Sequence, residues 1–174
     1  MTSTTLTNID LESRVHAAHP DQLRLWLRLL TCTQLIEKRV RLGLRLEFDT
    51  TLPRFDLMAQ LEKSPSGLKM VDLSKRLMVS GGNITAITDQ LVSEGWVQRV
   101  DVEGDRRSWK IQLTKAGKTY FNQMAKAHEI WILESFEGLS KKEIQTLHKL
   151  LAQVKHTALQ QLIGPDTSTL TEAL

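Results

Sequence analysis

The stretch from Gly67 to Thr114 constrains the fold of this chain more than any other part of its sequence. Leu73 and Leu77 stand one helical turn apart and polar residues fill the other positions, which predicts a short amphipathic helix that ends at Leu77. Residues 78–82 break this period, and Ser80 has the right side chain to cap a following helix by accepting a backbone N–H. Two short helices joined by a tight turn are therefore expected.

The second of these helices has one apolar face and one small, polar face. Ile84, Ile87 and Leu91 share the apolar face, and Gly95 follows as a C-terminal stop. The residues that would face outward are Ser80, Asn83, Thr85, Ala86 and Gln90. Residues 97–102 and 109–113 then have strand character, with turn-forming residues between them. A slim helix beside a hairpin suits the major groove, so double-stranded DNA is the expected partner.

The hairpin carries two arginines near its tip, Arg106 and Arg107. A guanidinium group there can enter a narrow minor groove, whose negative potential attracts it; the alternative is a solvated, charged hairpin. On the second helix, Asn83 and Gln90 could pair with adenine edges, and the alternative is an ordinary polar face. Lys110, in the second strand, is a further candidate for DNA contact.

Several motifs resemble the MarR family of bacterial transcriptional regulators across roughly residues 21–163. The matching motifs are Leu73 to Leu77, Asn83-Ile84-Thr85, Asp89 to Arg99, Asp105-Arg106-Arg107, and Leu113-Thr114-Lys115-Ala116-Gly117. The resemblance implies a mainly α winged helix-turn-helix with a small β-wing, and dimerisation through helices from both termini. It also implies that Arg107 enters a groove while Asp105 and Asp89 support the wing. Ala86 and Gln90 depart from the family pattern, which often has arginines there, so affinity is expected to shift toward the wing, Lys69, Lys75, Arg76 and Lys110.

The sequence predicts one DNA-binding unit between long helical segments. The expected organisation is a flexible arm at 1–20, dimerisation helices at 21–48 and 114–163, the winged helix-turn-helix at 53–113, and a flexible tail at 164–174. The first helix carries apolar residues on or near one stripe: Leu23, Leu27, Leu30, Leu35 and Leu42. The last helix carries a second stripe: Ile144, Leu147, Leu151, Val154, Ala158 and Leu162. One subunit cannot bury both stripes, so a homodimer follows.

Composition restricts the protein class. An apolar fraction of 41% and a charged fraction of 25% in 174 residues are ordinary for a globular protein, and a net charge of +3 mildly favours an anionic partner. The single Cys32 excludes an internal disulfide and a cysteine-based zinc site, and no apolar run predicts a signal peptide or a membrane span, so a cytoplasmic protein is expected. Neither a phosphate-binding glycine loop nor a nucleophile with a base at a recognisable spacing is found, so no enzyme and no cofactor is predicted.

A small-molecule effector is also expected. Trp26, Arg28, Met58, His128 and Trp131 could line an aromatic pocket, although such residues at helical spacing are often simple core. The basic residues Lys38, Arg39, Arg41, Arg45 and Arg54 could bind an anion, or form a solvated face. The runs from Arg24 to Thr33 and from Leu52 to Asp56 resemble MarR-type regulators of hydroxycinnamate and other aromatic-acid catabolism. This resemblance implies an aromatic acid, or its coenzyme A thioester, as effector.

The leading hypothesis is a homodimeric repressor that leaves an inverted-repeat operator when it binds the effector. One alternative is an architectural protein that binds DNA without specificity and without an effector. The other is a redox sensor that uses Cys32, but its place within an apolar helix favours a buried, unreactive side chain.

Overall fold

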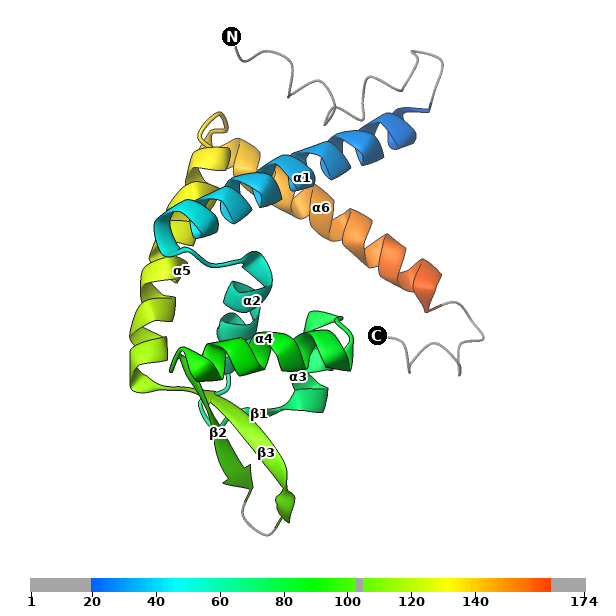
Figure 1. The fold of residues 1–174 in the computed structure, drawn as a ribbon. Coiled ribbons are helices and arrows are strands. Elements are labelled where there is room, and N and C mark those ends of the chain that lie inside the picture. The colour runs from blue at the N-terminus through cyan, green and yellow to red at the C-terminus, as the bar shows by residue number, and fades with distance from the viewer. Residues whose placement is uncertain (1–19, 103–104, 164–174) are drawn as a thin grey trace.

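The chain folds into helices that carry one small antiparallel sheet (Figure 1). The computed structural model describes residues 20–102 and 105–163, with the backbone alone at residues 102 and 105–108. The elements are α1 (Asp21–Phe48), α2 (Leu52–Glu62), β1 (Leu68–Lys69), α3 (Met70–Leu77), α4 (Gly81–Ser93), β2 (Val97–Val102), β3 (Asp105–Leu113), α5 (Lys115–Ser135) and α6 (Lys141–Leu162). The prediction of a mainly α fold with a β-wing is confirmed. The predicted arm at 1–20, except residue 20, and the predicted tail at 164–174 lie outside the described residues.

The sheet has the strand order β1-β3-β2, and both pairs are antiparallel. Val97 pairs with Leu113 and Arg99 with Ile111, so cross-strand neighbours share a face. β3 begins at Asp105, earlier than its alternating pattern predicts, because the pairing with β2 continues to Val102. The strand β1 could not be predicted from the sequence, since two residues are too few to show a period.

One apolar core joins α2, α3, α4 and the sheet. Leu73 of α3, Ile84 and Leu91 of α4, and Ile111 of β3 are each at most 1% exposed. The sequence spacing predicts that the buried face of α2 consists of Phe55, Met58, Ala59 and Leu61. Phe55, Met58 and Leu61 are buried, and Ala59 is half-buried. These contacts fix the two helices of the helix-turn-helix on the sheet, so the outer face of α4 has a defined direction.

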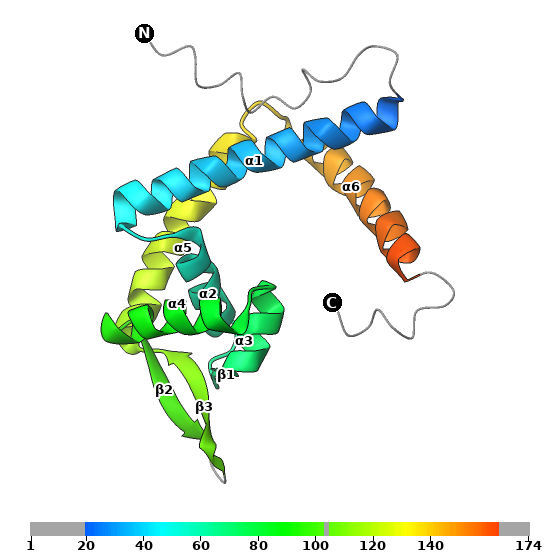
Figure 2. The same cartoon turned by 45° about the vertical axis from the view of Figure 1, so that its right-hand side comes forward.

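Helices α1 and α5 cross closely at one point. Gly43 lies against the indole of Trp131, where an added Cβ would come within 2.5 Å of the ring. The buried residues of α1 are Thr31, Val40, Gly43 and Leu44. Of the predicted leucine stripe, Leu23, Leu35 and Leu42 are exposed, which agrees with the expectation that one subunit cannot bury it. The physical reason is that α5 covers the C-terminal half of α1, while the N-terminal half extends past it (Figures 1 and 2).

Helix α5 buries a slightly different line of residues from the predicted one. The sequence spacing predicts that the inward line of α5 consists of Ala116, Tyr120, Met124, Ala127 and Trp131. Of these, Met124 and Trp131 are buried. Phe121 and Gly117 are also buried, whereas Ala116 is exposed, so the inward line is rotated relative to the prediction. Gly117 fits because the backbone of Trp96 passes directly over it.

Helix α6 stands apart from the rest of the chain along most of its length (Figure 2). The sequence Ser140-Lys141-Lys142-Glu143 predicts a capping box, and α6 begins with one. The Ser140 hydroxyl accepts from the backbone N–H of Glu143, whose carboxylate accepts from the backbone N–H of Ser140. None of its residues is buried. Over the described residues, no helix has the length and apolar character needed to cross a bilayer.

Candidate nucleic-acid interface

The outer face of α4 is open along its length. Ser80, Asn83, Thr85, Ala86 and Gln90 are all exposed, while Ile84, Thr88 and Leu91 are buried on the inner face. Because residues three or four positions apart share a helix face, the exposed set forms a strip of small and polar side chains. The strip has room for close approach to base edges.

Ser80 begins α4 in a way that differs from the expectation. Its backbone has the extended conformation of an N-cap, but its hydroxyl makes no capping hydrogen bond. The N–H groups of Asn83 and Ile84 donate instead to its carbonyl oxygen, each at 3.1 Å. The predicted side-chain cap is therefore wrong, and capping does not occupy the hydroxyl.

An ion pair connects α4 to the wing. Asp89 of α4 accepts from the guanidinium of Arg99 on β2, and the two side chains are 54% and 43% exposed. A pair this exposed contributes about 0 to 1 kcal/mol to stability, so it acts mainly on the orientation of the wing. Arg99 was not singled out from the sequence, because its partner lies on another element. The side chains of Asp105, Arg106 and Arg107 lie outside the described residues.

Two lysines are neighbours on the sheet. Lys69 of β1 pairs directly with Lys110 of β3, and Lys69 is exposed while Lys110 is half-buried. Like charges opposite one another on a sheet are destabilising. An anion such as a phosphate would relieve this repulsion.

The C-terminal end of α4 contacts α2 and α5. Glu94, the C-cap of α4, pairs with Arg54 in the first turn of α2. Two residues later, the indole of Trp96 stacks on Tyr120 of α5 with 4.4 Å between ring centroids. Burial raises the pKa of Tyr120, so its phenol stays protonated and donates to the carbonyl oxygen of Phe48 at 2.7 Å. Neither contact was predicted.

The residues predicted to line an effector pocket occupy different environments. Met58 and Trp131 are core residues, 1% and 3% exposed, whereas Trp26 is 56% exposed on α1. His128 stacks on Phe55 with centroids 5.0 Å apart. The structure therefore does not bring these four together around one open space.

The arginines of the predicted anion site all have acidic partners within the chain. Arg39 pairs with Glu134 at 3.1 Å and lies over the ring of Trp131 at 5.3 Å. The other pairs are Arg41 with Glu37, Arg45 with Asp49, and Arg54 with Glu94. These pairs favour the alternative in which the basic residues form a charge-balanced face.

The half-buried carboxyl group of Asp56 lies close to this face. Burial raises the pKa of Asp56, and the charges of His128 and Arg41 oppose that rise. The carboxyl therefore holds its proton to higher pH than an exposed aspartate does.

Two cavities lie along α1. The first, about 200 Å³, is lined by Asp21, Arg24, Leu25 and Arg28, so it contains one predicted effector residue. The second, about 250 Å³, is lined by Cys32, Leu35, Ile36 and Ser135.

Cys32 is exposed, and the prediction that it is a buried apolar residue is wrong for a single subunit. The neighbouring Thr31 is buried instead, so the buried face of α1 includes Thr31 and not Cys32.

Comparison with known proteins gives one consistent family. The model of the MarR family matches residues 50–109. The chain is 31% identical to the HTH-type transcriptional regulator PecS of Dickeya dadantii over 103 residues, which are 58% of this chain and 62% of that protein. It also matches an uncharacterized HTH-type transcriptional regulator of Bacillus subtilis, YfiV, over 66% of that protein's length. The chain thus spans slightly less than two thirds of these two relatives.

Solved structures extend the similarity over most of the chain. A MarR family transcriptional regulator from Silicibacter pomeroyi is 30% identical, with a TM-score of 0.64 over 79% of this chain and 95% of that one. A mutant of MarR from E. coli, complexed with operator DNA, is 26% identical, with a TM-score of 0.65 over 77% of this chain and 95% of that one. These relatives are transcriptional regulators and not enzymes.

Proposed function

The chain belongs to the MarR family of transcriptional regulators, and on that premise we propose that it is a cytoplasmic, homodimeric repressor that binds an inverted-repeat operator. A small aromatic carboxylate or its coenzyme A thioester releases it from DNA. The observation that carries the DNA-binding part is the open outer face of α4, held in place by a buried inner face and by the Asp89–Arg99 pair.

The residues on that face suit the reading of A·T pairs. Asn83 and Gln90 can each donate to and accept from an adenine edge in the major groove. Thr85 donates its hydroxyl to the carbonyl oxygen of Gly81 at 2.9 Å. That bond fixes the side chain, and Ala86 beside it is small and apolar, so the two can take up thymine methyl groups. The Lys69–Lys110 pair adds positive charge for phosphates.

The homodimer is supported by apolar surface that this chain leaves uncovered. On α1 the exposed apolar residues are Leu23, Leu25, Trp26, Leu35, Leu42 and Leu46; on α6 they are Ile144, Leu150, Leu151, Val154, Leu159 and Leu162. Exposed apolar side chains on two long helices favour an interaction surface. A second copy of the chain would cover them and place two α4 helices about one DNA turn, roughly 34 Å, apart.

The effector part of the proposal rests on the cavity at the start of α1. Arg24 and Arg28 line the cavity at the start of α1, and guanidinium groups bind carboxylates in a bidentate manner. The cavity volume of about 200 Å³ is below the roughly 300 Å³ at which pockets for drug-sized ligands begin. The free acid therefore fits this cavity better than the thioester.

The test is fluorescence anisotropy on the DNA upstream of the protein's own gene and on a scrambled duplex at one salt concentration. We expect selective binding that an aromatic acid or its thioester reverses. Gln90→Ala and Asn83→Ala should each weaken operator binding by roughly 1 to 3 kcal/mol. The matched controls are Gln123→Ala and Asn122→Ala, at exposed positions on α5, and these should bind as the wild type does.

Three other results would each refute a part of the proposal. Equal binding to both duplexes, without any ligand effect, would indicate an architectural DNA-binding protein. A monomer in sedimentation at the concentrations used for binding would refute the two-fold operator. Loss of a peroxide response in Cys32→Ser would indicate a redox sensor instead of a ligand sensor.

A further inference from the structure

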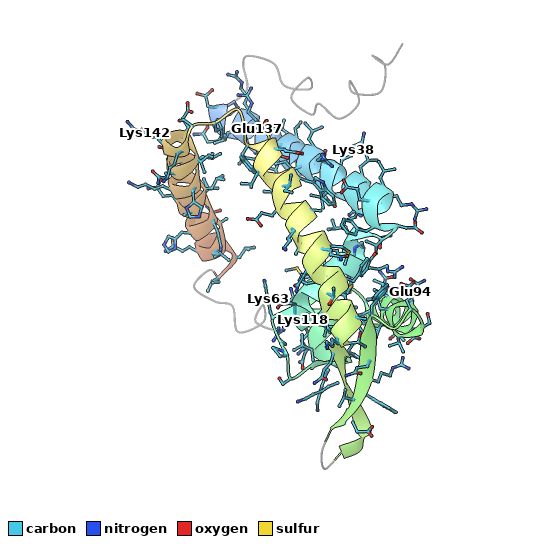
Figure 3. All side chains as sticks on the ribbon, turned by 90° about the vertical axis from the view of Figure 1, so that its left-hand side faces the viewer. Lys38, Lys63, Glu94, Lys118, Glu137 and Lys142 are labelled. Carbon is cyan, nitrogen blue, oxygen red and sulfur yellow. The ribbon has the colours of Figure 1, made fainter. Side chains whose placement is uncertain are left out.

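One contact at the C-terminal end of α4 lies outside the strip of side chains that would face DNA. Arg54, in the first turn of α2, donates to the carboxylate of Glu94, which caps the C-terminus of α4. The Arg54 side chain is 16% exposed and that of Glu94 is 40% exposed. Figure 3 shows Glu94 at the end of α4, on the side away from α6.

The environment of Arg54 makes the pair more than a surface contact. The Nε of Arg54 is buried and has no hydrogen-bond partner among the described residues. A guanidinium group that is partly removed from water needs its counter-charge, because an unpaired buried charge is costly. Arg54 therefore depends on Glu94, and Glu94 fixes the end of α4 to α2.

A second contact fixes the same end of α4 to α5 and α1. Trp96 stacks on Tyr120, and Tyr120 donates to the carbonyl oxygen of Phe48, the last residue of α1. The carbonyl oxygen of Trp96 also accepts from the backbone N–H of Thr114 at 3.1 Å. The end of α4 therefore has two attachments: the Arg54–Glu94 pair joins it to α2, and the aromatic stack joins it to α5.

We infer that Arg54 is a positioning residue for DNA recognition: through Glu94 it sets the angle at which α4 is presented, and it does not touch DNA itself. The inference rests on the proposed function. It gives Arg54 a role distinct from effector binding, because its guanidinium is already engaged by Glu94. Operator DNA requires α4 at one angle, whereas scrambled DNA is held mainly through phosphates and is less sensitive to that angle.

The experiment compares Arg54→Gln with the wild type on operator and scrambled duplexes over a series of salt concentrations. We expect operator affinity to fall roughly 3- to 30-fold, the range typical of residues that act through packing at a distance. Affinity for the scrambled duplex should change less than about twofold. The salt dependence should keep its slope, since a residue that binds phosphate contributes about one unit to it.

Two further variants make the result specific. Arg45→Gln removes an arginine from an exposed pair with Asp49, whose side chains are 68% and 90% exposed, and it should leave both affinities unchanged. The double variant Arg54→Glu with Glu94→Arg restores the opposite charges and should recover at least part of the operator affinity. Glu94→Gln, at the more exposed partner, should reproduce the loss if Arg54→Gln proves too unstable to assay.

Four outcomes would overturn the inference about Arg54. A slope lowered by about one unit would mean that Arg54 contacts phosphate directly, and unchanged operator affinity would mean that it does not position α4; either result overturns the inference alone. An equal loss on both duplexes would show a purely structural role and also overturns it. If the wild-type protein fails to distinguish the duplexes, the proposed function fails and the role of Arg54 in recognition falls with it.

Discussion

Replacement of Gly117 by alanine should destabilise the protein through a single backbone contact. An added Cβ at this position would lie 1.8 Å from the carbonyl oxygen of Trp96 and 2.7 Å from its carbonyl carbon. Carbon–oxygen contacts normally keep about 3.3 Å, so α5 and the end of α4 would have to separate by roughly 1.5 Å. Because the obstacle is backbone, no change of rotamer can relieve the contact.

The expected magnitude follows from three effects. Forced overpacking costs about 1 to 3 kcal/mol. The separation also breaks the hydrogen bond from the Thr114 N–H to the Trp96 oxygen, 3.1 Å long, which is worth about 1 kcal/mol. Alanine gains up to about 1 kcal/mol over glycine in a helix, which leaves a net loss of about 2 kcal/mol. For a protein of this length, the loss corresponds to a fall in Tm of roughly 4 to 8 °C.

The assay is thermal unfolding followed by circular dichroism at a fixed protein concentration, because association shifts Tm. Gly138→Ala is the matched control, since nothing lies within 4 Å of a Cβ built there. We expect its Tm to stay within a degree or two of the wild type. If Gly117→Ala melts no lower than Gly138→Ala, the close approach of Trp96 to α5 is not a stabilising feature, and the reasoning is refuted.

Three other predictions concern pH, capping and the wing. Burial raises the pKa of Asp56, so its contribution to stability is present below the ordinary value of 3.8 and is lost as the pH rises through the raised value. Asp56→Asn should therefore flatten that part of the profile of urea midpoints against pH, and an unchanged profile would contradict this. Thr114 caps α5 and donates to the carbonyl oxygen of Gly95 at 2.7 Å, so Thr114→Ala should cost about 1 to 2 kcal/mol while Thr114→Ser should not; equal losses would exclude capping as the cause. Asp89→Asn should reduce operator affinity in anisotropy. Its Tm should hardly change, because the pair of Asp89 with Arg99 is exposed. Full operator affinity in this variant would show that the pair does not orient the wing.

The helix-turn-helix could be predicted because its signals are local. The apolar spacing of Leu73 and Leu77, then of Ile84 and Leu91, gives both helices, and Gly95 marks the end of the second with a φ of 77°. Each of these signals needs only neighbours within one or two helical turns. The outer face of α4 follows from the inner one, so the exposed candidate residues could also be predicted.

The contacts that could not be predicted from the sequence depend on which distant element covers a residue. The leucines of α1 are regularly spaced, yet α5 covers Val40 and Leu44 and leaves Leu35 and Leu42 in water. The Arg54–Glu94 pair joins residues 40 positions apart, and no sequence period links them. Apolar sequence patterns indicate which residues can be buried. The way in which the helices cross determines which of them are buried.

The same crossing determines how the proposed dimer could respond to a ligand. A continuous line of aromatic rings runs from Trp131 at the α1–α5 crossing to Trp96 at the end of α4. The ring centroids are 6.4 Å apart from Trp131 to Phe48, 6.1 Å from Phe48 to Tyr120, and 4.4 Å from Tyr120 to Trp96. Because Gly43 leaves no free space against Trp131, α1 cannot slide along α5 without moving this ring. A ligand that favours a different α1–α5 crossing would therefore shift the end of α4 relative to α5, and in the proposed dimer the spacing of the two α4 helices would no longer fit the operator.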